Sequence, residues 1–418
     1  MNFSNPIKCN YIKIDKNNNN LAIIKNNYKE IDIYSIENFK KITSFQFKEI
    51  IDKIKFSYLN NLILILFKNN NLEIKNIFDS TFNCQIMDNI VPISNIKFSP
   101  DSNKIIIVDE FNLKINIYNL ENKKVYYIQN PKFHNKNFIK FSNSKLICII
   151  PEKFQIKEYL GIYLLKDFSL INYFQLNNKI EIKEYYFLND DSKIVILNQI
   201  NYNFFIINLF GEIISEIEID NNILDNINNF KLSFNKKFLC LSMLNNIILY
   251  DIFYYNKIET LKNLDFNQKT LFFEEIIENK KNENSKTYKL IQIPKFPYQI
   301  KNNKKIKNIL FSYDSNYLAY LDENYPNCLF VYNIPLLYYF SVIILSKEIK
   351  DFKWSIFNNY LYIISGLSKI YVFNIKKNFK CIDVSSNIQI ENMKISKNGK
   401  NFILSDKKKS QFVIGCLD

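Results

Sequence analysis

One pattern of short apolar stretches recurs along almost the whole chain, and it limits the folds that are open to it. In the clearest copy, Ser94–Phe98 alternates polar with apolar residues and is followed by the turn residues Ser99-Pro100-Asp101-Ser102. A β-branched run, Lys104–Val108, and two further stretches, Leu113–Leu120 and Lys124–Ile128, complete this copy. Alternation predicts a strand with one buried face, and a continuous apolar run predicts a strand covered on both faces. Each copy therefore predicts a four-stranded antiparallel sheet.

The residue that ends the first strand of each copy gives the period of the repeat. These positions lie 41 to 47 residues apart, except for one interval of 77 residues. They are Phe56, Phe98, Phe141, Phe187, Phe234, Phe311, Trp354 and Ile395. Four short strands with a period near 42 residues are typical of a WD40-type β-propeller blade. A weaker copy that begins at Tyr11–Ile14 brings the count to nine blades, with eight as the alternative.

The two ends of the chain complement each other in this pattern. The last copy stops after three strands, and residues 2–8 precede the first copy as an additional strand. Because a closed propeller leaves no exposed sheet edge, we expect the N-terminal strand to pair into the last blade. The predicted fold is all-β, one large propeller over residues 1–418. Truncation of Phe98 or Trp354 to Ala is expected to cost about 3–5 kcal/mol, since both rings would lie between sheets.

The 77-residue interval contains an insertion, residues 263–308, between the sixth and seventh blades. Thr270–Ile277 and Thr287–Ile293 predict a β-hairpin around a polar tip, Lys280–Ser285. A basic tract follows at Lys301, Lys304, Lys305 and Lys307. Two interpretations stay open, namely an elongated outer strand pair with a loop, or an arm that binds a partner.

The residue inventory excludes the common catalytic and cofactor sites. A Ser-His-Asp machine or a His-based metal site would have to use the single histidine, His134, which lies in a polar turn. The five glycines are isolated, so neither glycine-rich phosphate motif is present. We therefore predict no catalytic residue, no cofactor and no metal.

Cysteine usage and apolar runs indicate the environment of the protein. The seven cysteines are scattered and contain no C-x-x-C pair, which predicts reduced thiols in the cytosol or nucleus. Cys148 and Cys240 lie in apolar runs and are predicted to be core residues. The longest apolar run, Leu336–Leu345, is too short to span a membrane, and Met1–Pro6 does not resemble a secretory signal. The expectation is an intracellular protein without a membrane segment.

The chain carries a formal net charge of +14, and every Lys or Arg position is occupied by Lys. Lysines supply point charges without the two-pronged geometry with which Arg reads guanine and phosphate. We interpret the charge as a bias of residue usage and predict no specific nucleic-acid partner. Diffuse attraction to acidic surfaces stays open.

Several stretches resemble the WD repeat protein 8 (WRAP) family of centrosomal and spindle-pole proteins. The most specific match lies in blade seven, at Phe311–Ala319, Asn324–Asn327 and Phe330–Ile334. Weaker matches are Met1–Ser4, Phe98–Ser102, Glu110–Ile115, Phe352–Trp354 and Cys416–Asp418. The Trp-Asp pairs of typical repeats are replaced here by Tyr118-Asn119, Tyr250-Asp251, Tyr332-Asn333 and Phe373-Asn374.

The resemblance implies a non-enzymatic adaptor in the cytoplasm, on the cytoskeleton, at a centrosome or spindle pole. Its implied partners are a coiled-coil protein and a minus-end-directed kinesin, with roles in anchoring microtubule minus ends and in cilium assembly. The family supplies no motif-defined binding residue. The candidate partner contacts come from the blade-seven turn and the insertion: Asn324, Tyr325, Pro326, Asn327, Phe272 and Phe273.

A translation-initiation or RNA-associated factor is the alternative, because some initiation factors carry large propellers and a basic chain could lie on ribosomal RNA. The lack of Arg and of a recognisable RNA module counts against it. A propeller hydrolase is disfavoured further by the single histidine.

Overall fold

In this computed structural model the structure describes residues 2–9, 11–15, 19–25, 27–79, 81–87, 91–218, 229–242, 246–261, 264–279, 286–300, 306–356, 359–375, 379–384, 388–396, 401–406 and 410–416. Several residues named in the sequence analysis lie outside these ranges: Lys280–Ser285, Lys301, Lys304 and Lys305. Within the described part, strands form nine sheets, here called blades and numbered in chain order. The chain divides into two compact units, Asn10–Ile223 and a unit of Met1–Cys9 with Leu224–Asp418.

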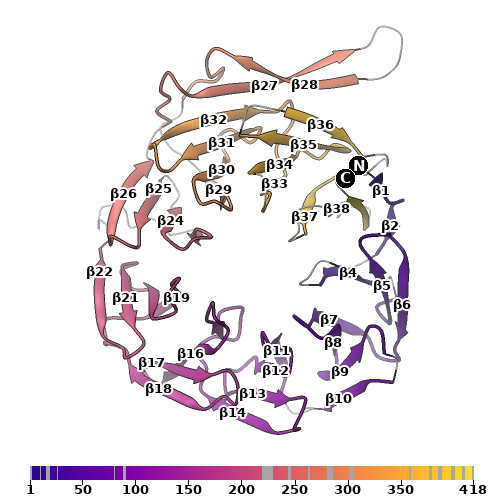
Figure 1. Ribbon diagram of the computed structural model, residues 1–418, viewed down its shortest axis with the longest axis vertical. Helices are drawn as coiled ribbons and strands as arrows, with labels where there is room; N and C mark the ends of the chain where they lie inside the picture. The colour runs from indigo at the N-terminus through magenta and orange to yellow at the C-terminus, as the bar shows by residue number, and fades with distance from the viewer. Residues whose placement is uncertain are drawn as a thin grey trace. The chain divides into compact units, whose positions relative to one another are not determined.

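The unit Asn10–Ile223 contains blades one to five, each a four-stranded antiparallel sheet with its strands in chain order (Figure 1). Blade one consists of β3 (Tyr11–Ile14), β4 (Asn20–Ile24), β5 (Glu30–Ser35) and β6 (Lys41–Gln46). Blade two consists of β7 (Ile51–Phe56), β8 (Leu62–Phe67), β9 (Asn71–Asn76) and β10 (Asn83–Met87). Blade three consists of β11 (Ile93–Phe98), β12 (Lys104–Asp109), β13 (Lys114–Asn119) and β14 (Val125–Gln129). Blade four consists of β15 (Lys140–Phe141), β16 (Ile147–Phe154), β17 (Lys157–Leu164) and β18 (Leu170–Gln175). Blade five consists of β19 (Ile182–Phe187), β20 (Lys193–Asn198), β21 (Phe204–Asn208) and β22 (Ile213–Ile217).

The other unit contains blades six to nine. Blade six consists of β23 (Asn229–Leu232), β24 (Phe238–Ser242), β25 (Ile247–Asp251) and β26 (Asn256–Leu261). Blade seven consists of β29 (Ile306–Phe311), β30 (Tyr317–Asp322), β31 (Cys328–Asn333) and β32 (Tyr338–Ile344), joined by β27 (Leu271–Asn279) and β28 (Lys286–Ile293). Blade eight consists of β33 (Asp351–Trp354), β34 (Tyr360–Ile364), β35 (Lys369–Asn374) and β36 (Phe379–Asp383). Blade nine consists of β37 (Asn392–Ile395), β38 (Asn401–Asp406) and β39 (Gln411–Cys416), with β1 (Asn2–Phe3) and β2 (Ile7–Lys8) paired to β39.

The burial of the strands follows the hydrophobic pattern of each repeat. Every residue of the second strands β8 and β12 is buried, because side chains on both faces pack against neighbouring blades. The first strands β7 and β11 alternate buried with partly exposed residues. The fourth strand β18 is mostly exposed. Large side chains between adjacent blades therefore form the core.

A serine turn connects the first and second strands of most blades. In blade two, the Leu62 N–H donates to Oγ of Ser57 (2.9 Å), which directly follows Phe56. Corresponding bonds of 2.8–3.2 Å are accepted by Ser99, Ser142, Ser233, Ser312 and Ser396. The hydroxyl that accepts from a backbone N–H reinforces the turn beside the backbone bond that the serine N–H donates, such as Ser57 N–H to the Leu62 carbonyl (2.8 Å).

This turn corrects one assignment in the repeat. Phe234 was predicted to end the first strand of blade six, but that strand ends at Leu232 and is followed by the turn residue Ser233. The Phe234 ring is 59% exposed. The prediction followed the aromatic residue and therefore placed the end of the strand two residues too late, at Phe234 instead of Leu232. The predicted burial of Phe98 and Trp354 is confirmed, with exposed fractions of 3% and 8%.

A second set of hydrogen bonds joins the turns of adjacent blades. Oγ of Ser102 in blade three accepts the N–H groups of Tyr58 and Leu59 in blade two, both at 2.8 Å. The Asp191 carboxylate in blade five likewise accepts the N–H groups of Asn143 and Ser144 in blade four, both at 2.7 Å. Polar turn residues therefore link neighbouring blades within this unit.

The N-terminal segment completes the last blade, as predicted. Phe3 of β1 pairs with Gly415 of β39, and the Ser4 N–H donates to the Ile414 carbonyl (2.8 Å). The Phe3 ring also lies against Gly415, where an added Cβ would come within 2.6 Å of it. The prediction of an all-β propeller with nine blades, closed by pairing of the N-terminal strand with the last blade, is confirmed.

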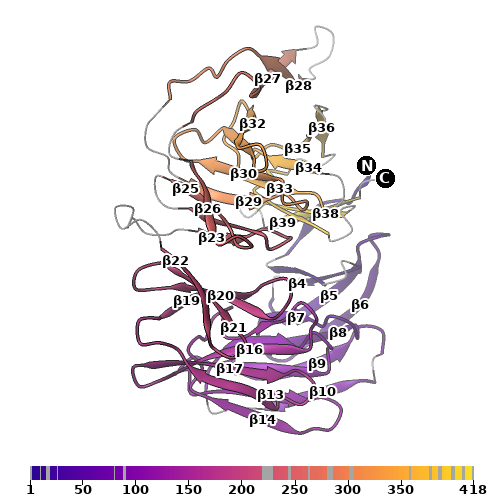
Figure 2. The ribbon, with the colours of Figure 1, turned by 60° about the vertical axis from the view of Figure 1, so that its left-hand side comes forward.

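The insertion forms the predicted β-hairpin, and the hairpin belongs to blade seven. β27 and β28 pair antiparallel, while Leu271–Glu274 of β27 pairs in parallel with Ser341–Ile344 of β32. Figure 2 shows this hairpin beyond β32, at the edge of the sheet. The interpretation as an elongated outer strand pair is the one that the structure favours.

Candidate functional site: a groove between two blades

The turn Asn324–Asn327, predicted as a partner contact, is bound by the chain itself. The Tyr325 ring is buried, and its hydroxyl donates to the Gln299 carbonyl (2.7 Å). Nδ2 of Asn327 donates to the Tyr298 hydroxyl (2.8 Å). Pro326 is exposed and Asn324 partly so. The segment that follows the hairpin thus lies against this turn.

The two predicted aromatic contacts of the hairpin, Phe272 and Phe273, are also buried. Phe272 faces the core between blades six and seven, where its ring lies 6.1 Å from that of Phe296. Phe273 faces blade eight and packs edge to face on Phe373 at 5.3 Å. As consecutive strand residues they point to opposite faces of the sheet. Both rings therefore bind the hairpin to the blades, and their role as partner contacts stays a prediction.

Phe296 brings two of the predicted residues together. Its ring lies 5.5 Å from that of Tyr325 and 6.1 Å from that of Phe272. It also lies 5.2 Å from the ring of Phe266, in the segment before the hairpin. The segment that follows the hairpin thus places an aromatic side chain at the interface of blades six and seven.

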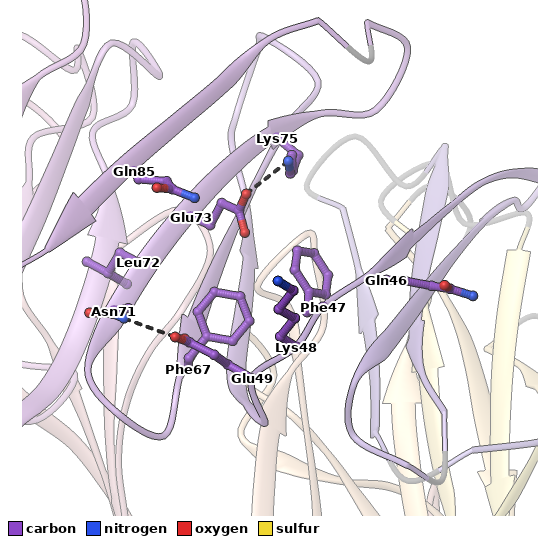
Figure 3. Close-up of a pocket in the computed structure, with 10 residues that line it drawn as sticks. All are labelled: Gln46, Phe47, Lys48, Glu49, Phe67, Asn71, Leu72, Glu73, Lys75 and Gln85. Carbon is purple, nitrogen blue, oxygen red and sulfur yellow. Dashed lines mark hydrogen bonds and ion pairs between the residues drawn. The ribbon is translucent and has the colours of Figure 1, made fainter.

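An open groove lies between blades one and two. It has a volume of about 270 Å³ and is lined by Gln46, Phe47, Lys48, Glu49, Phe67, Asn71, Leu72, Glu73, Lys75 and Gln85 (Figure 3). The rings of Phe47 and Phe67 meet edge to face with centroids 5.3 Å apart. Phe47 comes from the connection between the blades and Phe67 from the end of β8. The groove therefore has an aromatic wall.

An ion pair and a hydrogen bond engage polar side chains around the groove. Nζ of Lys75 lies 2.9 Å from Oε1 of Glu73, and Nδ2 of Asn71 donates to Oε1 of Glu49 at 3.2 Å (Figure 3). Oδ1 of Asn71 is buried and has no hydrogen-bond partner among the described residues. Neighbouring side chains thus hold the Glu49 and Glu73 carboxylates, which favours binding over acid–base chemistry.

A second hollow of about 260 Å³ lies along the same pair of blades, lined by Ile42, Thr43, Phe45, Asn76, Ile77 and Phe78. Among the described residues, β6 pairs only with β5, so its other edge carries unpaired backbone groups. Such an edge can bind an extended peptide. The sequence analysis did not identify this site, although the aromatic residues Phe45 and Phe47 flank Gln46 at the end of β6.

The remaining candidate groups do not assemble into a reactive centre. His134 is exposed. Cys148 and Cys240 are fully buried, as predicted, and burial raises the pKa of both thiols. Within the described ranges, no group of three or more His, Cys, Asp or Glu side chains could hold a metal ion. Nor does any helix among those residues reach the length and apolarity that crossing a membrane requires.

Comparison with solved structures identifies the fold. The C-terminal WD40 domain of Sif2 superimposes with a TM-score of 0.52 at 10% identity, covering 98% of this chain and 96% of that domain. A eukaryotic initiation factor superimposes with a TM-score of 0.57 at 10% identity, covering 89% of this chain and 88% of the other. No protein-family model and no curated protein matches the sequence. The chain has the fold of a WD40-like β-propeller.

Proposed function

We propose that this protein is a non-catalytic scaffold that holds extended segments of partner proteins, with the groove between blades one and two as a docking site. The observation that carries the proposal is the open aromatic groove beside the free edge of β6. The packing of Phe296 at the interface of blades six and seven supports the proposal, because there the chain holds one of its own aromatic side chains between two blades. A partner segment with an aromatic side chain fits the wall formed by Phe47 and Phe67.

We further propose that the scaffold acts in the cytoplasm at a centrosome or spindle pole. The support is the resemblance of Phe311–Ala319 and Asn324–Asn327 to the WD repeat protein 8 family. On this proposal its partners are a coiled-coil protein and a minus-end-directed kinesin.

Tagging the protein in dividing cells tests both statements. The wild type is expected to gather at spindle poles and to co-purify with a coiled-coil pole protein. Gln85→Trp places a large ring in the groove from an exposed position, so it should reduce that recovery at least about tenfold if the groove carries the contact. Gln175→Trp, on the exposed strand β18, is the matched control and should change nothing.

A second candidate is a translation-initiation or RNA-associated factor. The net charge of +14 and the fold shared with an initiation factor favour it. Diffuse localisation together with co-sedimentation on ribosomal subunits at moderate salt would replace the first proposal by this one.

A further inference from the structure

Four lysines occupy the same position in the first strands of blades one to four. They are Lys13, Lys55, Lys97 and Lys140. Each lies opposite a buried apolar residue of the second strand: Ala22, Leu64, Ile106 and Ile149. In each of the four blades, the lysine is the residue directly before the last residue of the first strand. The four, together with Lys53 and Lys136, are here called the lysine strip.

Neighbouring first strands bring these lysines together. β3 lies beside β7, and β7 lies beside β11. Nζ of Lys97 donates to the carbonyls of Lys136 (2.8 Å) and Ile139 (3.0 Å) in the segment that leads to blade four. Nζ of Lys53 likewise reaches the Ser94 carbonyl of blade three (3.3 Å). The strip is therefore continuous across blade boundaries.

The strip concentrates positive charge that is partly withdrawn from water. Burial lowers the pKa of Lys13, and Lys136 lowers it further. Burial also lowers the pKa of Lys55, with added repulsion from Lys13, Lys136 and Lys53. These groups lie close enough to repel one another, which favours an anion that would relieve the repulsion.

Some other lysines of the same unit pair with carboxylates. Lys25 pairs with Glu30, Lys41 with Asp32 (2.7 Å) and Lys153 with Glu181 (3.4 Å). Lys13, Lys55 and Lys136 form no ion pair among the residues that the structure describes. Acids also lie beside the strip: Asp52 is 3.5 Å from Lys53, and Glu184 acts on Lys140, whose pKa is lowered by burial and raised by this carboxylate.

The other unit carries lysines at the same position of three first strands: Lys231, Lys353 and Lys394. Lys353 pairs with Asp351 at 2.9 Å, and blade seven has Leu310 at this position. Repulsion between lysines that lowers their pKa acts on Lys13 and Lys55, in blades one and two.

We propose that the lysine strip binds an acidic segment, rich in Asp and Glu, of a partner protein. Compact ammonium groups bind carboxylates singly, without the fork geometry that Arg supplies. Nucleic acid is less suited, because base stacking needs open ring faces. The rings beside the strip lie under ammonium groups, with Lys97 4.5 Å from the Phe138 centroid and Lys140 4.2 Å from that of Tyr186. The inference is independent of the groove between blades one and two.

The test is binding of a fluorescent polyglutamate peptide to the full chain, with polyglutamine as the neutral control. Lys13→Gln/Lys55→Gln/Lys136→Gln should weaken binding at least about tenfold. Lys25→Gln/Lys41→Gln/Lys153→Gln removes the same net charge from paired positions and should change affinity less than about twofold. Thermal melting of each variant checks that it is folded.

Three results would overturn the proposal. If the wild-type protein does not bind polyglutamate at moderate salt, the strip is not a binding site for acidic segments. If both triple variants lose the same amount of affinity, the binding is diffuse electrostatic attraction and not a site. Tighter, strip-dependent binding of polyuridylate would assign the strip to nucleic acid instead. Gln85→Trp, which fills the groove, should leave polyglutamate affinity unchanged, so failure here is separable from failure of the proposed function.

Discussion

The hydroxyl of Tyr371 in blade eight donates a 2.7 Å hydrogen bond to Oε1 of Glu275 in the inserted hairpin. Oε2 of the same buried carboxylate accepts the N–H and the hydroxyl of Ser346, at 2.8 and 2.7 Å. One acidic side chain thus connects β27, the end of blade seven and blade eight. The hairpin is thereby part of the blade packing, in line with the burial of Phe272 and Phe273.

Removing this carboxylate should destabilise the unit. Glu275→Ala leaves the Tyr371 hydroxyl and the Ser346 N–H without their acceptor and is expected to cost about 2–3 kcal/mol, measured by urea unfolding. The matched control is Glu278→Ala, on the same strand as Glu275. It removes an exposed carboxylate that pairs with Lys289 of β28, and it should lower the free energy of unfolding by less than about 1 kcal/mol. Equal losses in the two variants would contradict the role of Glu275.

The serine turn can be tested in blade seven. Ser312 is fully buried, and its Oγ accepts the Tyr317 N–H at 2.9 Å. Ser312→Ala should therefore lower the free energy of unfolding by about 1–2 kcal/mol. Ser169→Ala, at an exposed turn hydroxyl, should lower it by less than about 0.5 kcal/mol. A stable Ser312→Ala protein would show that strand pairing alone holds the turn.

The contact between Phe3 and Gly415 predicts non-additive mutations. Gly415→Ala places a Cβ 2.6 Å from the Phe3 ring, so the ring must move, at a cost of about 1–3 kcal/mol. In a Phe3→Ala background the same change should cost clearly less, because the obstructing ring is absent. A double-mutant cycle by thermal unfolding measures the difference, and simple additivity would argue against this packing.

Thiol ionisation predicts a loss of stability in alkali. Burial, the largest cause, raises the pKa of Cys381 from 9.0 to about 11. The unfolded chain then releases its thiol proton at lower pH than the folded chain. Stability from this group is complete below pH 9 and declines as pH rises toward 11. The decline should be smaller in Cys381→Ser, and iodoacetamide should label Cys381 slowly at neutral pH; rapid labelling of the native protein would oppose this.

The repeat made the blades predictable, because alternation, buried runs and turn residues all recur with one period. The error at Phe234 arose because the end of each first strand was assigned from its aromatic residue. In blade six the turn serine, Ser233, directly follows the strand and gives its correct end. The lysine strip was visible as Lys13, Lys55 and Lys97 in matching positions, but the excess of lysine throughout the chain concealed it.

The candidate site depended on contacts that no local pattern carries. The parallel pairing of β27 with β32 joins segments separated in the chain by four other strands of the same blade, so hairpin rules could not predict it. Likewise, no local pattern predicted the hydrogen bond from the Tyr325 hydroxyl to the Gln299 carbonyl, which engages the predicted docking turn with another segment of the same chain. The groove beside Phe47 exists only because two blades meet there.

The pairing of β1 with β39 also bears on the order in which the molecule can assemble during translation. Within this sequence, β1 is synthesised some four hundred residues before its partner, Gly415. Blades one to eight can therefore acquire all their strands before β1 has a partner to pair with. Blade nine can become complete only after β39 has been synthesised, so it is the last of the nine blades to obtain its full set of strands.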